Sequence, residues 1–447
     1  MTLPRGLCVN SAGHLEIAGC DTVDIAQQYG TPLYVMNEDL IREHCREYQQ
    51  GFGGRYPRWR VLYASKAFLT TAICRLIEAE GLGLDVVSGG ELYTALAAHF
   101  PPELIYFHGN NKTPDEIEMA LRAGVGRFMV DSDYELELLN AIASRLGRTA
   151  SVILRVTPGI EAHTHDYVQT GQLDSKFGIS LAEDQIMMTV RQALALPHIG
   201  LKGLHCHIGS QIFELAPYRL AAEVMVELLH RIQREFGIAL AELDLGGGVG
   251  IQYTDEDHPL TRGAFVETVI DAVTKACERH DFPLPELLIE PGRSLVGDAG
   301  ITLYSVGSIK DVPSIRRYVA VDGGMVDNPR PALYGARYEA VVANKADQPR
   351  SERISLAGRC CESGDMLIKD ITLAPVESGD LIAVFATGAY NYSMASNYNR
   401  LPRPAVVMVT EGQAHVVVRR ESYSDLIAND IIPAHLRRVP EAANSND

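Results

Sequence analysis

Three kinds of residue suited to covalent and anion chemistry lie at or just after the end of a short apolar run. Lys66 comes after VLYA (61–64), Gly246 to Gly248 come after LDL (243–245), and Glu290 closes LLIE (287–290). A lysine amine can form a Schiff base with an aldehyde. Glycines let backbone N–H groups approach a phosphate, and a carboxylate can keep a nearby ring nitrogen protonated. A nucleophile, an anion site and an acid–base group are therefore available, provided that the fold brings them together.

The segment Gly358–Asp365, GRCCESGD, places two adjacent thiols beside carboxylates, between runs that favour strands. Cys360 and Cys361 are neighbours, and a disulfide between adjacent cysteines is rare and strained. From the residues alone, this segment could be a metal site, a redox pair, part of an active site or an ordinary turn. Because side chains alternate along an extended chain, only one of the two thiols can face a site.

Short apolar runs alternate with longer amphipathic segments between residues 60 and 290. Eight runs predict strands: VLYA (61–64), LGLDVV (82–87), LIYF (104–107), RFMV (127–130), SVILRV (151–156), LKGLHCH (201–207), LDL (243–245) and LLIE (287–290). The segment EDLIREHCREYQQGF predicts a helix, and so do the segments after Thr113 and Ser132, where each hydroxyl precedes a glutamate by three residues. Eight strands interleaved with helices predict a parallel (β/α)8 TIM-like barrel, with an open doubly wound sheet as the alternative.

The sequence changes character after residue 300. The β-branched runs RRYVAVDG, DLIAVFATG and AVVMVTEGQAHVVVRR follow one another with turns between them and predict a second, all-β domain. HLEIAG and PLYVMN near the N-terminus are also strand-like, and we expect them to join that domain. The expected division is N-terminal strands over 1–36, the barrel over 37–295 and the C-terminal β domain over 296–447.

Composition limits the classes of function. The 447 residues carry a formal net charge of −17, which disfavours nucleic acid as a partner, because a phosphate backbone binds basic surfaces. The first residues lack the apolar core of a signal peptide, and no apolar run is long enough to cross a bilayer. Eight scattered cysteines without CxxC spacing favour reduced thiols. We expect a cytoplasmic protein whose partner is a small molecule, and no membrane partner.

In a barrel, reactive groups lie after the carboxyl ends of the strands, and phosphate often binds after the seventh and eighth. Lys66 and the glycine run have these positions. Their combination indicates pyridoxal 5'-phosphate, which draws electrons from a bound substrate. Glu290 would keep the pyridine nitrogen protonated and so strengthen that withdrawal, as loss of CO₂ from Cα requires. We expect His205 and His207 to face opposite sides of their strand, with one ring lying against the cofactor.

Six motifs, in order, resemble one enzyme family. They are YASKA, HCHIGSQ, DLGGGVG, EPGRSLVGDAG, CCESGD and GAYNYSMASNYN. Together they are similar to the fold-type III pyridoxal-phosphate-dependent decarboxylases, and most of all to members that act on diaminopimelate in the last step of lysine biosynthesis. The resemblance implies a carboxy-lyase that converts meso-2,6-diaminopimelate to L-lysine and CO₂. It also implies a homodimer whose active sites are shared between subunits.

The resemblance further implies roles for the matching residues. Lys66 is expected to form the Schiff base, with Asp85 near it and His207 stacked on the pyridine ring. The other expected cofactor contacts are Ser210, Gly246, Gly247, Gly248, Glu290, Gly292, Arg293 and Tyr390. The expected substrate contacts are Arg293, Arg330, Tyr334, Glu362 and Tyr390. Arginine suits this role because guanidinium binds a carboxylate through two hydrogen bonds.

For GRCCESGD, the resemblance selects Cys361 and Glu362 and implies that each subunit contributes them to the other subunit's site. Cys361 is the expected proton donor to Cα, because a thiol pKa lies close to neutrality. Glu362 is the expected ligand of the distal ammonium group, and Cys360 a core or interface residue. Asn391 stands where the resemblance leads us to expect glycine. Because asparagine tolerates a positive φ angle, we expect only a small local effect there.

Three alternatives remain open. A decarboxylase of the same fold acting on ornithine, lysine or arginine would need an acidic group, rather than arginines, at the distal end of its pocket. A metal-dependent hydrolase would use histidines as zinc ligands and would leave Lys66 without a role. Its candidate ligands are His163, His165, His205 and His207. A non-enzymatic pyridoxal-phosphate carrier of barrel form would lack the β domain. We expect pyridoxal phosphate and no metal.

Overall fold

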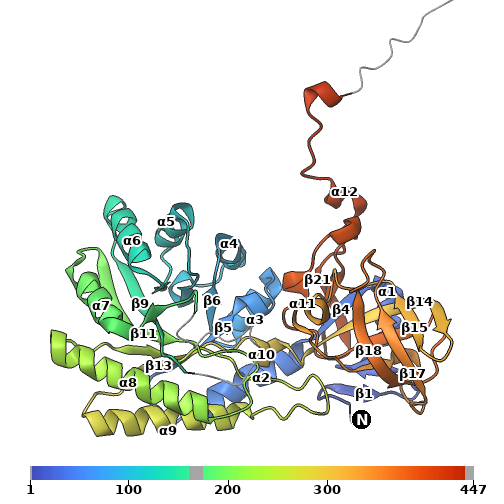
Figure 1. Ribbon diagram of the computed structural model, residues 1–447, viewed down its shortest axis with the longest axis horizontal. Helices are drawn as coiled ribbons and strands as arrows, with labels where there is room; N and C mark the ends of the chain where they lie inside the picture. Colours follow the sequence, from blue (N-terminus) through green and yellow to red (C-terminus); the bar gives the residue numbers. More distant parts are fainter. Residues whose placement is uncertain (1–2, 161–174, 438–447) are drawn as a thin grey trace, which may run out of the picture.

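The structure is a computed structural model that describes residues 3–160 and 175–437. A barrel built from the middle of the sequence lies beside a β domain built from the N-terminal strands and the C-terminal part of the chain (Figure 1). No helix in these two ranges is long and apolar enough to span a membrane.

The barrel consists of parallel strands in the order β9-β11-β12-β13-β5-β6-β7-β8, and pairing of β8 with β9 closes the ring. The strands are β5 (Trp59–Ala64), β6 (Gly83–Val86), β7 (Ile105–Phe107), β8 (Arg127–Val130), β9 (Ala150–Thr157), β11 (Ile199–Cys206), β12 (Glu242–Asp244) and β13 (Glu286–Ile289). A short strand, β10 (Ile179–Ser180), extends β9. The eight predicted strands and the barrel are confirmed; an open doubly wound sheet would leave β8 and β9 unpaired.

Helices cover the outside of the barrel. They are α2 (Glu38–Phe52), α3 (Thr71–Ala79), α4 (Gly89–Ala97), α5 (Pro114–Ala123), α6 (Asp133–Arg145), α7 (Gln185–Ala195), α8 (Ala216–Phe236) and α9 (Arg262–His280). The predicted starts after Thr113 and Ser132 are confirmed, since both hydroxyls accept a backbone N–H three residues later.

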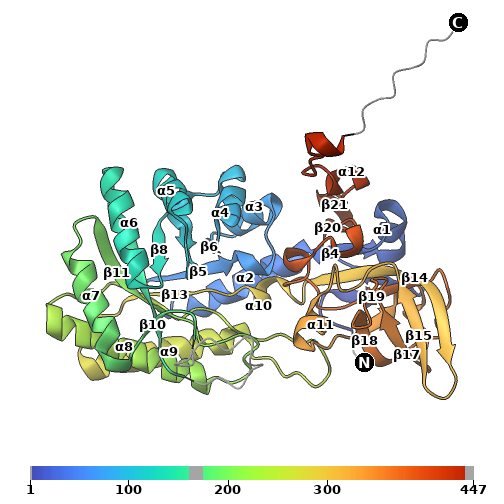
Figure 2. The same cartoon turned by 45° about the horizontal axis from the view of Figure 1, so that its top comes forward.

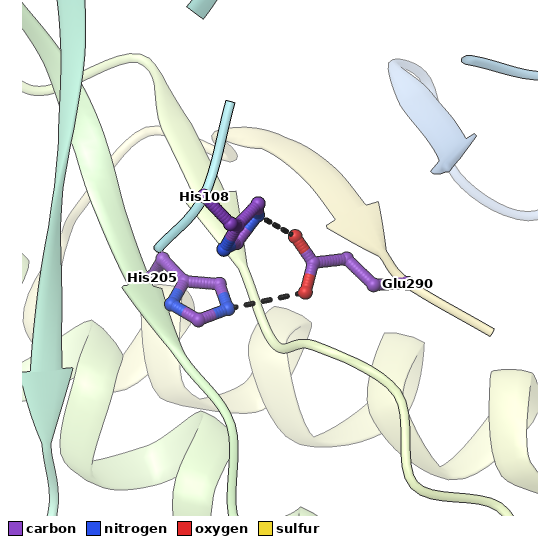
Figure 3. A group of neighbouring side chains, drawn as sticks. All are labelled: His108, His205 and Glu290. Atoms are coloured by element: carbon purple, nitrogen blue, oxygen red, sulfur yellow. Dashed lines mark hydrogen bonds and ion pairs between the residues drawn. The ribbon is translucent and has the colours of Figure 1, made fainter. Parts of the chain in front are cut away.

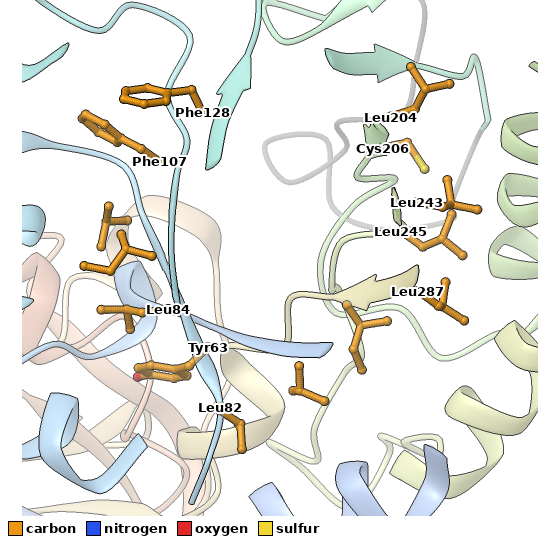
Figure 4. Close-up of a cluster of buried hydrophobic side chains, with 14 of the residues drawn as sticks. Tyr63, Leu82, Leu84, Phe107, Phe128, Leu204, Cys206, Leu243, Leu245 and Leu287 are labelled. Atoms are coloured by element: carbon orange, nitrogen blue, oxygen red, sulfur yellow. The ribbon is translucent and has the colours of Figure 1, made fainter. Parts of the chain in front are cut away.

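Alternate residues of the barrel strands face two different apolar layers. Leu204, Cys206 and Leu243 point outward toward the helices (Figure 4). A separate cluster fills the opposite, inner face and consists of Leu62, Tyr106, Met129, Ile153 and Leu288. This inner cluster forms an apolar floor below the carboxyl ends of the strands, so polar residues there stand on a rigid base.

The β domain contains a sheet in the order β18-β17-β15-β14-β4-β20-β21, and β19 pairs with β14 and β16. Its strands are β4 (Leu33–Asn37), β14 (Gly300–Val312), β15 (Arg316–Val321), β16 (Ala340–Val342), β17 (Glu352–Ala357), β18 (Met366–Leu373), β19 (Leu381–Val384), β20 (Ala405–Thr410) and β21 (Gln413–Val418). β4, predicted from PLYVMN, lies between β14 and β20. A strand from the N-terminus therefore joins two C-terminal strands.

The other N-terminal piece, HLEIAG, forms β2 (Leu15–Ile17), which pairs with β1 (Leu7–Val9) and β3 (Cys20–Asp21) in a separate small sheet. Leu15 and Ile17 nevertheless pack in the same apolar core as β4. The short helix α1 (Thr22–Tyr29) connects this small sheet to β4.

Three short helices lie outside the barrel layer: α10 (Arg293–Val296), α11 (Arg330–Tyr334) and α12 (Tyr423–Leu426). After β21, residues 419–437 leave the β domain as a projecting segment that carries α12 (Figures 1 and 2). We call residues 419–437 the C-terminal arm.

Candidate active site

The carboxyl ends of the barrel strands open into one cavity of about 790 Å³. Lys66 follows β5, Asp85 lies near the end of β6, His207 follows β11, and Glu290 follows β13. All four line the cavity. Closure of the barrel brings together residues that are more than 200 positions apart in the sequence.

Most of the predicted site residues line this cavity. They are Lys66, Asp85, His207, Ser210, Gly248, Glu290, Gly292, Arg293, Arg330, Tyr334 and Tyr390. Gly246 and Gly247 do not line it. An added Cβ would lie 2.7 Å from the carbonyl oxygen of Cys206 at Gly246, and 2.1 Å from that of Glu290 at Gly247. These two glycines therefore allow three strand-end loops to pack closely beside the cavity.

The Lys66 amine lies in an anionic surrounding. Burial by itself lowers the pKa of Lys66, but the charges of Asp85, Tyr390 and Glu290 act against burial and raise the pKa above its ordinary value. Asp85 is 2% exposed, and burial raises the pKa of its carboxyl to about 6. The cavity therefore holds the lysine protonated until a ligand changes its surroundings.

Two buried histidines bracket the Glu290 carboxylate (Figure 3). His205 Nε2 lies 3.2 Å from Glu290 Oε2, and His108 Nε2 lies 2.5 Å from Glu290 Oε1. Burial alone would raise the pKa of Glu290, yet the two histidines lower it well below its ordinary value. Burial lowers the pKa of His205 to about 4. At neutral pH, a neutral His205 thus donates from Nε2 to an ionised Glu290.

The prediction that His205 and His207 face opposite ways is wrong. Both face the inside of the barrel, because residues two apart in a strand lie on the same face. Cys206, between them, points outward into the apolar layer. His207 Nδ1 accepts a hydrogen bond from the Gly247 backbone at 3.2 Å. Burial and the neighbouring Lys66 hold the pKa of His207 well below its ordinary value.

Arg293 lies against one wall of the cavity. Its Nη2 donates to Ser210 Oγ at 3.0 Å, and its Nη1 donates to the Tyr253 hydroxyl. The guanidinium also lies over the Tyr390 ring, 4.7 Å from its centroid. Arg293 is 6% exposed, so its planar group is fixed before any ligand binds.

Arg330, the first residue of α11, lies close to the same tyrosine. Its guanidinium is 4.7 Å from the Tyr253 ring centroid, and its Nη1 donates to the Tyr338 hydroxyl at 2.6 Å. Burial alone lowers the pKa of Arg330, but Tyr253 and Tyr338 more than offset it, and the net pKa lies above its ordinary value. Two permanent cations therefore line one cavity, where they can bind a carboxylate.

Asn391 needs no tolerance of a positive φ angle, because its own φ is −101° and the positive φ, 62°, belongs to Tyr390. Asn391 is fully buried, and its Oδ1 accepts from the Tyr338 hydroxyl at 3.5 Å. Asn391 thus ends a hydrogen-bond chain that runs through Tyr338 to Arg330. A change at Asn391 can therefore affect Arg330, which lines the cavity.

Cys361 and Glu362 lie apart from this cavity. Both are exposed on a β-domain loop, and neither is among the described residues that line the cavity. Asn399 Oδ1 accepts from the Cys361 backbone N–H at 2.8 Å. Asp365 holds the turn by accepting from the Cys360 backbone N–H at 2.7 Å. Burial and Asp365 raise the pKa of the half-buried Cys360 thiol to about 12.

His108, Arg155 and Tyr253 are among the cavity residues that the sequence analysis did not identify. His108 directly follows the predicted strand LIYF, and Arg155 is the one charged residue within SVILRV. A position directly after a barrel strand, or a charge inside an apolar run, was therefore an available signal. Tyr253 gave no such signal, because its loop follows the glycine run without a recognisable pattern.

Two of the zinc ligands proposed for a hydrolase, His163 and His165, lie outside the described residues. Within residues 3–160 and 175–437, the group with suitable ligand spacing is His108, His205 and Glu290. His207 is not part of it. The donor atoms of this group instead contact one another directly, at 2.5 and 3.2 Å.

The residues of the cavity fit pyridoxal phosphate. Asp85 Oδ1 and Arg293 Nε are buried and have no hydrogen-bond partner among the described atoms. An amine, an ionised carboxylate and a neutral imidazole line the cavity, and Ser210, Gly248 and Gly292 lie beside them. The amine could bind the aldehyde of the cofactor, and the carboxylate could pair with its protonated pyridine. Ser210, Gly248 and Gly292 could hold its phosphate.

Comparison with known proteins gives consistent results. Residues 38–297 match the family model described as pyridoxal-dependent decarboxylase, pyridoxal binding domain. The chain is 54% identical to the diaminopimelate decarboxylase of Bacillus subtilis over 422 residues, which cover 94% of this chain and 96% of that protein. It is 45% identical to the enzyme of the same name from Synechocystis sp. over 443 residues, 97% of this chain and 94% of that protein.

A solved structure has the same fold over nearly its whole length. The diaminopimelate decarboxylase of M. jannaschii in complex with L-lysine superimposes with a TM-score of 0.89 at 36% identity. The alignment covers 98% of this chain and all of that chain (100%). The likeness therefore includes both the barrel and the β domain.

Proposed function

The chain belongs to the pyridoxal-dependent decarboxylase family, and from this premise we propose that it converts meso-2,6-diaminopimelate to L-lysine and CO₂. It is a decarboxylase that uses pyridoxal 5'-phosphate. The observation that carries the substrate assignment is the pair of buried arginines, Arg293 and Arg330, that line the same cavity as Lys66. A substrate with a second carboxylate satisfies both cations, whereas the distal ammonium of ornithine or lysine would be repelled by them.

Bound pyridoxal phosphate supplies an electron sink for the carbon that loses CO₂. We propose that Lys66 holds the cofactor covalently, that Asp85 sets the protonation of this amine, and that His207 stacks on the ring in its neutral form. Glu290, kept ionised by its two histidines, would accept the hydrogen of the ring nitrogen. Ser210 and the backbone of Gly248, Gly292 and Arg293, with the hydroxyl of Tyr390, would hold the phosphate, while the N–H groups of Gly246 and Gly247 donate to Asp244 and His207 instead.

For the substrate, we propose that Arg293, Arg330, Tyr334 and Tyr390 bind the distal carboxylate. Tyr253 and Tyr338 already hold the Arg330 guanidinium in place. Little further side-chain entropy is therefore lost when the guanidinium forms paired hydrogen bonds with a carboxylate. A lysine would offer a single charge at either position.

We further propose a homodimer in which Cys361 and Glu362 complete the site of the other subunit. The support is their position: both side chains are exposed, and neither lines the cavity of its own chain. In this arrangement the Cys361 thiol delivers a proton to Cα after CO₂ has left, and Glu362 binds the distal ammonium group. One chain alone then lacks the proton donor and the carboxylate that binds the distal ammonium group.

Mixing two inactive variants tests the shared site. Lys66→Ala removes one half of each site and Cys361→Ala the other, so both variants are expected to be inactive as pure proteins. If subunits exchange freely, half of the dimers are mixed and have one intact site, which restores about a quarter of the unmodified activity. Cys360→Ala, the matched control, should remain active when pure. Exchange without recovery would contradict the proposal.

Release of CO₂ tests the substrate directly. The purified enzyme should release CO₂ from meso-2,6-diaminopimelate, and Arg330→Lys should raise KM for it about tenfold or more. Faster release from ornithine, lysine or arginine would mean that the pocket recognises a cation. After borohydride reduction, peptide mapping should find the pyridoxyl group on Lys66.

Two broader assignments are also proposals. We propose functional units at residues 1–36, 37–295 and 296–447, supported by the family match over residues 38–297. We propose a cytoplasmic location, because the eight cysteines are free thiols, as expected in a reducing compartment.

A further inference from the structure

The C-terminal arm carries large apolar side chains that the described part of the chain leaves uncovered. Their exposed fractions are 80% for Tyr423, 60% for Ile427, 84% for Ile431, 62% for Ile432 and 64% for Leu436. The arm projects away from both the barrel and the β domain (Figure 2). Its α12 has four residues, and its 3-10 turn η8 (Ala434–Leu436) has three. Helices this short are not stable in isolation.

The three carboxylates of the arm each form an ion pair with an arginine of the same chain. Arg419 forms an ion pair with Asp425 at 2.6 Å, and Arg403 binds Glu421 at 2.6 Å. Asp430 is held at 3.0 Å by Arg400. The arm therefore offers an apolar surface with little net charge. Such a surface suits a protein partner. It suits a second copy of this chain in particular, because each copy has a net charge of −17 and a surface with little net charge adds no repulsion between the copies.

The arm is hydrogen-bonded to the loop that carries Cys361, through the 3-10 turn η7 (Tyr398–Arg400). Arg400 Nη1 donates to the Leu426 carbonyl in the arm at 2.6 Å. On the other side, Asn399 Oδ1 accepts from the Cys361 backbone N–H at 2.8 Å, and the Tyr398 hydroxyl donates to the Cys361 carbonyl at 3.4 Å. Three consecutive residues thus connect the two segments.

The backbone of η7 is strained. Asn399 has a φ of 53° and Arg400 a φ of 54°. Left-handed conformations are unfavourable in non-glycine residues, and they persist where surrounding contacts hold them. Here the contacts are those to the arm on one side and to Cys361 on the other. These contacts therefore hold the turn in its strained conformation and fix the arm relative to the loop.

We propose that the arm docks on a second copy of this chain and, through η7, fixes the Cys361 loop at the cavity of that copy. This inference rests on the shared site proposed above. The partner is a second copy because the arm is hydrogen-bonded, through η7, to the loop that is proposed to enter that copy's site. A subunit that receives Cys361 must therefore lie next to the arm. Docking covers the arm's apolar side chains and holds the proton donor in position.

Substitution in the arm tests docking in the cofactor-loaded enzyme. The double variant Ile431→Asp, Ile432→Asp should raise the dimer dissociation constant, measured by sedimentation, about tenfold or more. A chain ended after Arg420 should behave in the same way. Ile315→Asp is the matched control, since Ile315 is 74% exposed but lies in the turn between β14 and β15. It should dimerise like the unmodified enzyme. Circular dichroism checks that each variant is folded.

A second variant tests the connection through η7. Arg400→Gln leaves the apolar side chains in place but removes the charged contact to the arm. We expect unchanged dimerisation and cofactor absorbance, with kcat lowered several-fold. Arg400→Lys, which keeps a donor, should recover part of kcat. If kcat were unaffected by Arg400→Gln, the arm would not position the loop.

The outcomes separate this inference from the shared site. If Lys66→Ala and Cys361→Ala subunits restore activity when mixed, while arm variants dimerise like the unmodified enzyme, the arm inference fails and the shared site stands. If mixing fails although subunits exchange, the shared site fails and the arm inference fails with it.

Discussion

At the scale of single residues, the Glu290 carboxylate shows how neighbours determine function. A buried glutamate ordinarily has a raised pKa, which would leave it protonated and unable to accept the hydrogen of a pyridine nitrogen. His108 and His205 reverse this effect and hold the pKa of Glu290 well below its ordinary value. His205 is thus a positioning residue, because it acts through Glu290.

His205→Phe removes a hydrogen-bond donor to Glu290 and should therefore destabilise its ionised form. Its pKa then rises, so Glu290 takes up a proton as the pH falls, and the loss of kcat should be larger at acidic pH than at alkaline pH. The cofactor absorbance should become pH-dependent over the same range. His205→Gln, which keeps an N–H donor, should be affected less. An unchanged pH profile for the phenylalanine variant would mean that His108 alone holds Glu290.

Asp85 should lower the stability of the cofactor-free enzyme at neutral pH. Its folded pKa is raised to about 6, from 3.8. The folded state therefore binds the proton more tightly than the unfolded state, so stability rises as pH falls from about 6 to about 4. Above pH 6, the ionised carboxylate costs on the order of 3 kcal/mol.

Asp85→Asn should remove that cost. The variant's melting temperature should exceed that of the unmodified cofactor-free enzyme at pH 7.5, and the two should converge near pH 4. Asp271→Asn, at a partly exposed position on α9, is the control and should show no such crossover. Equal melting temperatures at pH 7.5 would show that Asp85 is not destabilising.

Asn391 should support substrate binding through Tyr338. Asn391→Gly removes the acceptor of the Tyr338 hydroxyl, and a buried hydroxyl that loses its acceptor costs about 1–3 kcal/mol. Because Arg330 binds Tyr338, we expect a higher KM with a nearly unchanged kcat. In a Tyr338→Phe background, Asn391→Gly should add little to KM, and an equal effect in both backgrounds would rule out this chain of contacts.

At the scale of elements, the loops after β11, β12 and β13 function as one packed unit. His207 accepts from Gly247, and an added Cβ at Gly247 would lie 2.1 Å from the Glu290 carbonyl oxygen. Gly247 is therefore required by the close approach of neighbouring strand ends. A glycine run can be read in the sequence, but the neighbour that it approaches cannot.

Gly247→Ala should separate the loops after β12 and β13. We expect loss of cofactor binding and a melting temperature lower by several degrees, because backbone atoms cannot move aside as a flexible side chain can. Gly263→Ala in α9, where an added Cβ meets no atom within 4 Å, should leave both properties unchanged. Normal cofactor affinity in Gly247→Ala would show that the loops can relax.

At the scale of the whole molecule, an N-terminal strand holds the β domain together. β4 lies between β14 and β20, and all five of its residues are buried. The barrel sequence lies between β4 and β14 along the chain. Neither part is therefore a continuous segment that could be removed without loss to the other.

A chain that begins at Glu38 should not fold, although it keeps the whole barrel sequence. Without β4, the β20–β21 pair loses its connection to β14, and two central rows of backbone hydrogen bonds have no partner. A chain that begins at Asn10 loses only β1, an edge strand of the small sheet, and should remain active. Solubility, circular dichroism and activity distinguish the two. Full activity from Glu38 onward would mean that β4 is dispensable.

The sequence alone determined the features that depend on local pattern. Strand periodicity predicted all eight barrel strands, and the ordered motifs around Lys66 and Glu290 indicated the cofactor and the family. Most of the site residues named in advance line the cavity, because positions after barrel strands converge once the barrel closes.

The tertiary structure alone decided which neighbours those residues have. It paired His108 and His205 with Glu290, connected Asn391 to Arg330, gave the positive φ angle to Tyr390, and left Cys361 outside its own cavity. Each of these facts depends on a contact between residues far apart in the chain, or on the shape of a packed loop. Local propensity carries no information about such contacts, because they exist only after the barrel and the β domain have formed.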